Sequence, residues 1–325
     1  MSRSAVRTMV SYNAGRAARL VGSLTADQRA LPSFLIVGAQ RGGTTSLFKA
    51  LLQHPSFMPP RLRKGVHYFD VAYGNGQSWY LGHFPRRTQL EARSRRIGAP
   101  VITGEASPYY MWHPAVPGRI AADVPGVKLV VLLRDPVERA YSGHAHEFAR
   151  GFETEPFERA LELEPYRLAG EREKLLADPA YSSNAMQHLA HAGRGEYVDQ
   201  VLTLEAAVGR DRLIVLDSSD YFADPRPVFA QLCTFLGIPD APDVRHDRHN
   251  ARPRSTMAPE TEARLREHYA PYDKRLVDWL GWTPSWCRDG SPGGARDAAQ
   301  LSEMPWPRPS NDQPAADRLP PGGRA

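Results

Sequence analysis

A short apolar run followed by a glycine-rich turn is the feature that most constrains the fold of this chain. Residues 34–37 read Phe-Leu-Ile-Val and end at Gly38, which is typical of a buried strand. A helical pattern follows from Thr44 to His54 and stops at Pro55, because the residue before a proline disfavours the α conformation. The order of strand, glycine-rich loop and helix predicts a phosphate site, since backbone N–H groups and the helix N-terminus attract an anion.

The loop departs from the pattern of P-loop kinases and NTPases. It reads GAQRGGTTS over residues 38–46, with both outer glycines at the spacing of GxxxxGK[ST] and Thr45 at the final hydroxyl position. Thr44 stands where that pattern has its lysine, and the loop's cation is Arg41. A kinase or NTPase uses the lysine on its β- and γ-phosphates, close to Mg²⁺. The sequence therefore disfavours a kinase or NTPase, which stays open as an alternative.

A second apolar run points to a second anionic group on the ligand. Residues 128–133 read as a strand that ends in Arg134, and the Asp-Pro pair at 135–136 predicts the start of a helix. Ligands of open α/β sheets bind at the carboxyl ends of strands, so an arginine there favours a phosphate over a metal. Ser142 and His146 are four residues apart on the predicted helix and share one of its faces.

Strand patterns alternate with helical patterns along the rest of the chain. Further strands are expected at 101–103 and 212–216, and further helices at 225–236, 259–269 and 272–280. Such alternation predicts an α/β fold, P-loop-like, with three layers α/β/α around a central, mostly parallel sheet.

One folded domain is expected at 32–286, between two segments predicted to be flexible. The leader at 1–31 is basic and lacks the apolar core of a secretion signal, and the tail at 287–325 is rich in Pro and Gly. No apolar run approaches the roughly 20 residues of a membrane-spanning helix. We therefore expect a cytoplasmic protein without a transmembrane segment, and contact of the leader with a membrane surface stays open.

The amino-acid composition of the chain argues against a metal or a nucleic acid as ligand and suits a phosphate. The two cysteines, Cys233 and Cys287, show no metal-ligand spacing, so we expect no metal site. The net charge is +5, and the chain has no block of like charge that would indicate a nucleic-acid partner. Arginine supplies nearly all of the positive charge, which suits bidentate binding of a phosphate.

Four segments together resemble the sulfotransferases that use 3′-phosphoadenosine-5′-phosphosulfate (PAPS), especially the heparan-sulfate type and its bacterial relatives. Residues 34–48 resemble the family's 5′-phosphosulfate loop, and KGVHYFD at 64–70 resembles its KEVHFFD segment. Residues 129–142 resemble its 3′-phosphate motif, and 250–257 loosely resemble the late loop that closes over the nucleotide.

The resemblance implies a fold of the same P-loop-like type, binding PAPS as co-substrate without a metal. It implies in-line transfer of the sulfonate to a hydroxyl or an amine of a sugar, lipid or small-molecule acceptor. Arg41 would stabilise the charge that develops on the bridging oxygen, where the family usually has a lysine. The residues implied to bind PAPS are Gly42, Gly43, Thr44, Thr45 and Ser46 for the phosphosulfate, Arg134 and Ser142 for the 3′-phosphate, and Arg252 in the closing loop.

Two departures from the family pattern concern the acceptor side. Gly65 stands at the position of the family's general base, a glutamate, so either another residue takes the proton or the protein is an inactive binder of the nucleotide. The candidate bases are His146, which matches a histidine of the N-sulfotransferase branch, and then His67 and Glu105. Ala106 replaces the family's acceptor-binding lysine, which argues against a polysaccharide held in the heparan manner.

Overall fold

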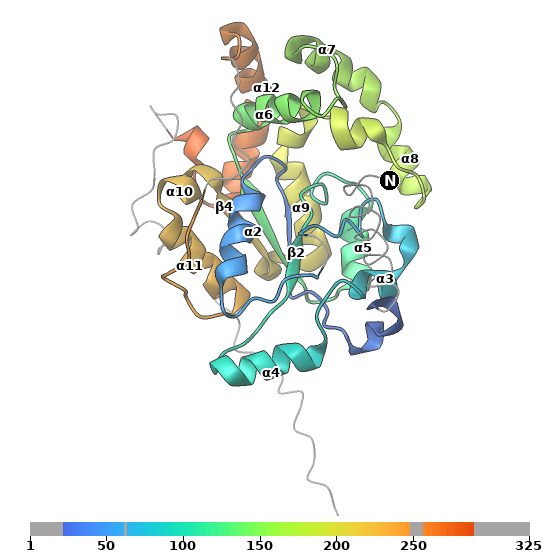
Figure 1. The fold of residues 1–325 in the computed structure, drawn as a ribbon. Coiled ribbons are helices and arrows are strands. Elements are labelled where there is room, and N and C mark those ends of the chain that lie inside the picture. Colours follow the sequence, from blue (N-terminus) through green and yellow to red (C-terminus); the bar gives the residue numbers. More distant parts are fainter. Residues whose placement is uncertain (1–21, 62–63, 248–255, 289–325) are drawn as a thin grey trace, which may run out of the picture.

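The computed structural model describes residues 22–61, 64–247 and 256–288. Its centre is a sheet of four parallel strands in the order β2-β1-β3-β4 (Figure 1). The strands are β1 (Phe34–Gly38), β2 (Gly104–Ala106), β3 (Lys128–Leu133) and β4 (Leu213–Asp217). Every strand residue except Lys128 is buried, as expected for a parallel sheet covered on both faces.

Alternation along the strands sends side chains into two separate cores. Leu129, Val131 and Leu133 of β3 pack with one set of helices, whereas Val130 and Leu132 pack with the other. The first set is α5 (Val116–Asp123), α9 (Tyr197–Val208) and α12 (Pro259–Leu280). The second set is α2 (Thr44–Gln53) and α11 (Pro225–Leu236). The expected three-layer α/β/α arrangement is confirmed.

A third group of elements stands beyond the carboxyl ends of the strands. Helices α6 (Pro136–Phe148), α7 (Phe157–Leu168) and α8 (Glu171–Ala177) occupy the upper part of the view in Figure 1. A small apolar cluster joins α6 and α7 to the start of α12, through residues such as Ala140, Phe157 and Leu265. The π-helical turn η3 (Ala185–Leu189) also belongs to this part of the chain. These elements overhang the edge of the sheet where ligands of such folds bind.

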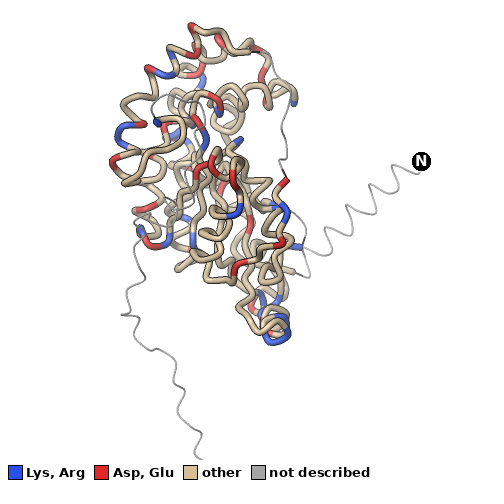
Figure 2. Tube along the Cα trace, turned by 90° about the vertical axis from the view of Figure 1, so that its left-hand side faces the viewer, with Lys and Arg blue, Asp and Glu red and all other residues tan. Residues whose placement is uncertain are grey.

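The remaining elements are short and lie around this frame. They are η1 (Ala26–Gln28), η2 (Tyr73–Asn75), α3 (Gln77–Leu81), α4 (Arg87–Ile97), η4 (Gly193–Gly195), η5 (Arg210–Arg212), α10 (Ser218–Ala223) and η6 (Ser285–Cys287). Helix α4 has no buried residue and carries Arg87, Arg93, Arg95 and Arg96. Helix α4 lies at the lower end of the molecule, away from α6 (Figure 1). Figure 2 shows basic residues gathered at this lower end. No described helix is long and apolar enough to cross a membrane.

Two expectations about elements were wrong. The strand expected at 101–103 forms at 104–106, because β1 pairs Phe34 with Gly104 and leaves Ile102 only an isolated bridge to Phe57. The helices expected at 259–269 and 272–280 are one helix, since Pro271 removes a single N–H donor without ending α12.

The folded part of the chain begins before residue 32 and runs past residue 286. Arg29 is buried and donates a hydrogen bond from Nη1 to the carbonyl oxygen of Phe84 at 2.8 Å. Arg288 binds the carboxylate of Asp220 at 2.7 Å. The rest of the predicted leader and tail, at 1–21 and 289–325, lies outside the described residues.

Candidate functional site

The phosphate loop joins β1 to α2 at the carboxyl edge of the sheet. Gly43 precedes α2 with φ of 99°, a conformation that is strained for any residue with a side chain. A Cβ on Gly42 would lie 2.2 Å from the carbonyl oxygen of Leu132. Both glycines are therefore required by the backbone path. Thr44 and Ser46 are buried and Thr45 is half-buried. The first turn of α2 leaves N–H groups without intrahelical acceptors, which suits an anion.

A lysine from a distant segment reaches this loop. Lys64 donates a hydrogen bond from Nζ to Oγ1 of Thr45 at 2.9 Å. Burial, together with a smaller effect of the positive charge of Lys49, lowers the pKa of Lys64 to about 8. Thr44 occupies the Walker lysine position, and Lys64 places a lysine beside the loop from another segment. The sequence alone predicted no role for Lys64, although it lies in the KGVHYFD segment that resembles the family's KEVHFFD segment.

Arg41 connects the loop to α6. It adopts a positive φ of 70° and donates from Nε to Oγ of Ser142 at 3.0 Å. The shared binding of a 3′-phosphate by Ser142 and Arg134 stays a prediction, and in the structure Oγ of Ser142 accepts from Arg41. Arg134 forms an ion pair with Glu138 at 2.9 Å, four residues along α6, and its side chain is 24% exposed. Asp135 caps α6 as expected, by accepting hydrogen bonds from the first N–H groups of the helix.

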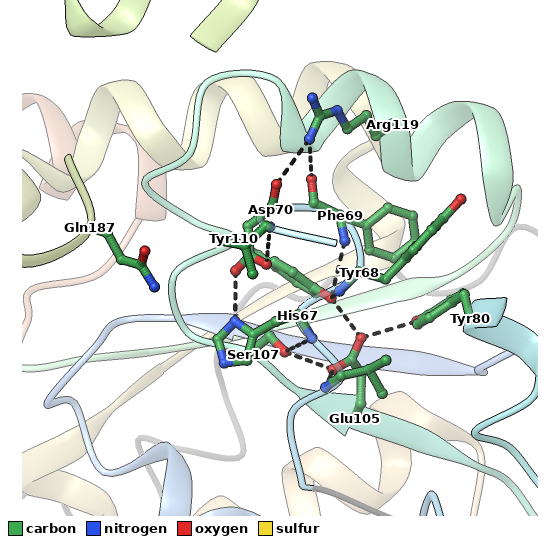
Figure 3. Close-up of polar contacts among 12 residues, drawn as sticks. His67, Tyr68, Phe69, Asp70, Tyr80, Glu105, Ser107, Tyr110, Arg119 and Gln187 are labelled. Atoms are coloured by element: carbon green, nitrogen blue, oxygen red, sulfur yellow. Dashed lines mark hydrogen bonds and ion pairs between the residues drawn. The ribbon is translucent and has the colours of Figure 1, made fainter. Parts of the chain in front are cut away.

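Glu105 on β2 is enclosed by hydrogen-bond donors (Figure 3). Its Oε2 accepts from the N–H of Val66 at 2.5 Å and from Oγ of Ser107 at 2.7 Å. Its Oε1 accepts from the hydroxyls of Tyr110 at 2.8 Å and Tyr80 at 3.2 Å. The side chain is fully buried, and burial raises the pKa of Glu105. A carboxyl group enclosed in this way organises the segment around Val66 and does not reach an acceptor.

Gly65 lies against the end of β2. The N–H of Ala106 donates to the carbonyl oxygen of Lys64 at 3.1 Å, which draws the two backbones together. A Cβ on Gly65 would lie 2.6 Å from the carbonyl oxygen of Ala106 and 3.0 Å from Oγ of Ser107. With this backbone the position excludes every side chain, including the glutamate that the family pattern has there.

His67 and Asp70 form a hydrogen-bonded pair two residues beyond Gly65. Nδ1 of His67 lies 2.7 Å from Oδ2 of Asp70, and the two side chains are 39% and 0% exposed. Arg119 donates to the carbonyl oxygen of Asp70 at 3.2 Å, and the N–H of His67 donates to Ser107 (Figure 3). The buried carboxylate thus holds a half-exposed imidazole in one orientation, with Nδ1 as donor and Nε2 as acceptor. Asp70 is a second residue that the sequence analysis missed.

His146 lies one helical turn after Ser142 on α6, as expected. Its Nε2 is 3.9 Å from Oε1 of Glu147, and its side chain is 25% exposed. The same Oε1 accepts from Nε2 of Gln40 at 3.3 Å, so this part of α6 faces the phosphate loop. His146 is therefore placed beside the donor loop, whereas His67 is placed at the end of β2. The remaining predicted residue, Arg252, lies outside the described residues.

The cluster of aromatic residues between 68 and 112 belongs mainly to the core. Tyr68, Tyr80, Tyr109 and Tyr110 are each 5% exposed or less. These four side chains are therefore too enclosed to line an acceptor cleft. Among the residues that the structure describes, no group of three or more His, Cys, Asp or Glu could hold a metal ion.

Comparison with known proteins identifies the family. The profile of the sulfotransferase domain matches residues 31–257. The chain belongs to the sulfotransferase family. A sulfotransferase from Alicyclobacillus acidocaldarius has the same fold, with a TM-score of 0.58 and 27% identity over 80% of this chain and 99% of that one. The family resemblance and the P-loop-like fold predicted from the sequence are confirmed, and nothing favours the kinase alternative.

This chain spans only part of the length of the curated relatives that it matches. Membrane-associated sulfotransferase kil1 of Dictyostelium discoideum is 38% identical over 112 residues, which are 34% of this chain and 22% of that protein. Heparan sulfate glucosamine 3-O-sulfotransferase 3A1 of Homo sapiens is 27% identical over 81% of this chain and 64% of that protein. Bifunctional heparan sulfate N-deacetylase/N-sulfotransferase 1 of Caenorhabditis elegans is 26% identical over 70% of this chain and 24% of that protein.

Proposed function

We propose that this protein transfers a sulfonate group from PAPS to a hydroxyl or an amine of an acceptor, without a metal. Family membership supports sulfonate transfer as the general reaction. PAPS as donor is the finer proposal, and the absence of a loop lysine together with the cations at Arg41, Lys64 and Arg134 supports it. These groups suit a ligand that carries anionic groups at two separate points.

The loop would hold the 5′-phosphosulfate. Backbone N–H groups from Gly42 to Ser46 and the hydroxyl of Thr45 would bind its oxygens, with Lys64 beside Thr45 as an additional cation. Arg134, at the carboxyl end of β3, would bind the 3′-phosphate. Ser142 now joins Arg41 in the structure, so its hydroxyl would either stay with Arg41 or turn to the phosphate when PAPS binds.

The transfer itself moves one group and one proton. The acceptor oxygen attacks sulfur, the bond from sulfur to the bridging phosphate oxygen breaks, and adenosine 3′,5′-bisphosphate leaves. Negative charge develops on that bridging oxygen, where a fixed cation stabilises the transition state more than the ground state. Arg41 is held by Ser142 and Lys64 by Thr45, so both cations are positioned before the reaction.

The acceptor proton would pass to His67. Asp70 accepts from Nδ1 of His67 and so leaves Nε2 as the basic nitrogen, as a general base requires. Glu105 is enclosed, and Gly65 offers no side chain. His146 is the alternative base, on the donor-loop side of the site. We favour His67 because its imidazole is both oriented by a buried carboxylate and half-exposed.

The observation that carries the proposal is a coincidence of backbone strain and chemistry. Among the residues at 22–61, 64–247 and 256–288, the non-glycine residues with positive φ are Arg41 and His67. Such conformations cost about 1–3 kcal/mol each and cluster at functional sites. The proposed transition-state cation and the proposed base therefore both have a left-handed backbone conformation, which residues with a side chain disfavour.

Calorimetry tests the donor. Adenosine 3′,5′-bisphosphate should bind without added metal, and ATP with Mg²⁺ should bind at least about tenfold more weakly, since it lacks the 3′-phosphate. Arg134→Ala should weaken bisphosphate binding much more than AMP binding. Equal losses for the two ligands would remove Arg134 from the 3′-phosphate, and tighter binding of ATP with Mg²⁺ would contradict the donor assignment.

A further inference from the structure

The π-helical turn η3 contains a glutamine whose side chain makes no hydrogen bond to another described residue. π-helical turns are rare and frequent at functional sites. Gln187, within η3, is half-buried, and its side-chain amide makes no hydrogen bond to another residue in the part of the chain that the structure describes. Figure 3 shows this amide directed toward the group formed by His67, Ser107 and Tyr110.

The backbone of η3 is fixed by a buried arginine. Arg194 donates from Nη2 to the carbonyl oxygens of Met186 at 2.7 Å and Gln187 at 2.8 Å. Its side chain is 4% exposed, and its guanidinium lies over the ring of Tyr109 at 5.1 Å. Because the buried guanidinium of Arg194 donates to two carbonyl oxygens of η3, it fixes the position of that turn.

The residue after Gln187 is fixed as well. His188 lies 3.0 Å from Oε2 of Glu147 through Nδ1, and its ring stacks on Phe152 with centroids 3.8 Å apart. Gln187 is thus held on one side by Arg194 and on the other by the partners of His188. The side chain of Gln187 therefore faces the site from a rigid turn and makes no hydrogen bond to another described residue. Such a side chain is suited to bind a ligand.

The phosphate loop contacts both Arg194, which fixes η3, and Glu147, which binds His188. Oε1 of Gln40 accepts a hydrogen bond from Arg194, and Nε2 of Gln40 donates to Oε1 of Glu147 at 3.3 Å. Gln40 is part of the phosphate loop, between Gly38 and Arg41. The loop that would hold the donor is therefore connected, through one side chain, to the turn that carries Gln187.

We propose that Gln187 hydrogen-bonds the acceptor opposite His67, and that Gln40 and Arg194 position it relative to the donor. The acceptor would carry a second hydroxyl next to the reacting one, because the amide offers one donor and one acceptor group beside the base. This inference rests on the proposed sulfonate transfer and adds the class of acceptor, a vicinal diol. Gln187 is a binding residue in this account, and Gln40 and Arg194 are positioning residues.

The test uses labelled PAPS and serial dilutions of a heat-treated extract of the cells that make the protein. Gln187→Ala should raise the half-saturating extract concentration about tenfold, the effect of losing one or two hydrogen bonds to a ligand. Its affinity for adenosine 3′,5′-bisphosphate should stay unchanged. The matched control is Gln89→Ala on the exposed helix α4, which should change neither quantity. An unchanged half-saturating concentration in Gln187→Ala would overturn the inference.

Two further arms test the positioning and the acceptor class. Gln40→Ala should raise the half-saturating concentration in the wild-type background and add little in the Gln187→Ala background, since both act through one contact. Additive effects would remove Gln40 from this role. In the wild type, trans-1,2-cyclohexanediol should accept label or compete better than cyclohexanol, and Gln187→Ala should abolish the difference. Equal effects of the two alcohols, or none, would overturn the diol assignment. Failure of the wild type to label anything would instead contradict sulfonate transfer itself.

Discussion

Lys64 and Thr45 are 19 residues apart in the chain, and their side chains meet at 2.9 Å between Nζ and Oγ1. The contact joins the segment before β2 to the first turn of α2, and it adds a lysine to a phosphate loop whose own cation is Arg41. The same segment continues through Gly65 to His67, so one stretch of chain supplies a donor-binding lysine and the proposed base.

The charge of Lys64 predicts a pH dependence of donor binding. Burial lowers the pKa of Lys64 to about 8, so in the free protein its positive charge is present below that pH and is lost as the pH rises through it. Calorimetric affinity for adenosine 3′,5′-bisphosphate should therefore fall above pH 8. Lys64→Met should bind at least about 30-fold more weakly at pH 7, the lower end expected for truncating a buried charge pair. Lys64→Arg should bind without the alkaline decline, and a decline that persists in Lys64→Arg would assign it to another group.

Arg41 should matter for turnover more than for binding. Arg41→Ala is expected to lower kcat at least about 100-fold, the scale for one preorganised charge-stabilising group. Arg41→Lys should keep part of the rate, and Arg95→Ala on the exposed helix α4 is the matched arginine control. Initial rates with labelled PAPS measure the effect. A near-normal kcat with only a raised KM in Arg41→Ala would remove it from the transition state.

The proposed base predicts which variant changes the pH profile. Protonated imidazole cannot accept a proton, so kcat/KM of the wild type should fall at acid pH. His67→Ala should abolish this acid limb and lower kcat about 100-fold or more. Asp70→Asn should lower kcat as well, because an amide cannot hold Nδ1 as the donor in the same way. Loss of the limb in His146→Ala instead, with His67→Ala unaffected, would favour the residue that the sequence analysis ranked first.

Gly65 should tolerate no side chain. A Cβ would lie 2.6 Å from the carbonyl oxygen of Ala106, so Gly65→Ala should lower the free energy of unfolding by about 1–3 kcal/mol through overpacking. Gly74→Ala is the matched control, since its Cβ would meet nothing within 4 Å. Denaturant unfolding measures both. Gly65→Glu should not raise turnover. A more active Gly65→Glu enzyme would show that the wild type lacks a base.

The sequence predicted the parts of the site that one local pattern encodes. The phosphate loop, the strand that ends in Arg134 and the Asp135 cap each depend on neighbouring residues, and the structure has all three. Contacts across the chain were not predictable in this way. No partner was predicted for Arg41, because sequence spacing does not reveal that its Nε reaches Oγ of Ser142.

The acceptor side shows the same limit. Glu105 was a candidate base from its sequence position, yet four donors enclose it, and two of them, Val66 and Tyr80, come from distant segments. Lys64 and Asp70 received no role because their partners, Thr45 and His67, are recognised only when the segment folds against α2 and β2. Gln187 had no motif at all, and only the geometry of its turn draws attention to it.

Transfer of label from PAPS tests the central claim most directly. The wild type is incubated with ³⁵S-labelled PAPS or with γ-³²P-labelled ATP and Mg²⁺, each with the same cell extract, and the products are separated and weighed by mass spectrometry. The account predicts ³⁵S in a product that is heavier by one sulfonate group, lost in Arg41→Ala, and no transfer of ³²P. Transfer of ³²P without ³⁵S, or tight bisphosphate binding with no ³⁵S-labelled product, would contradict it.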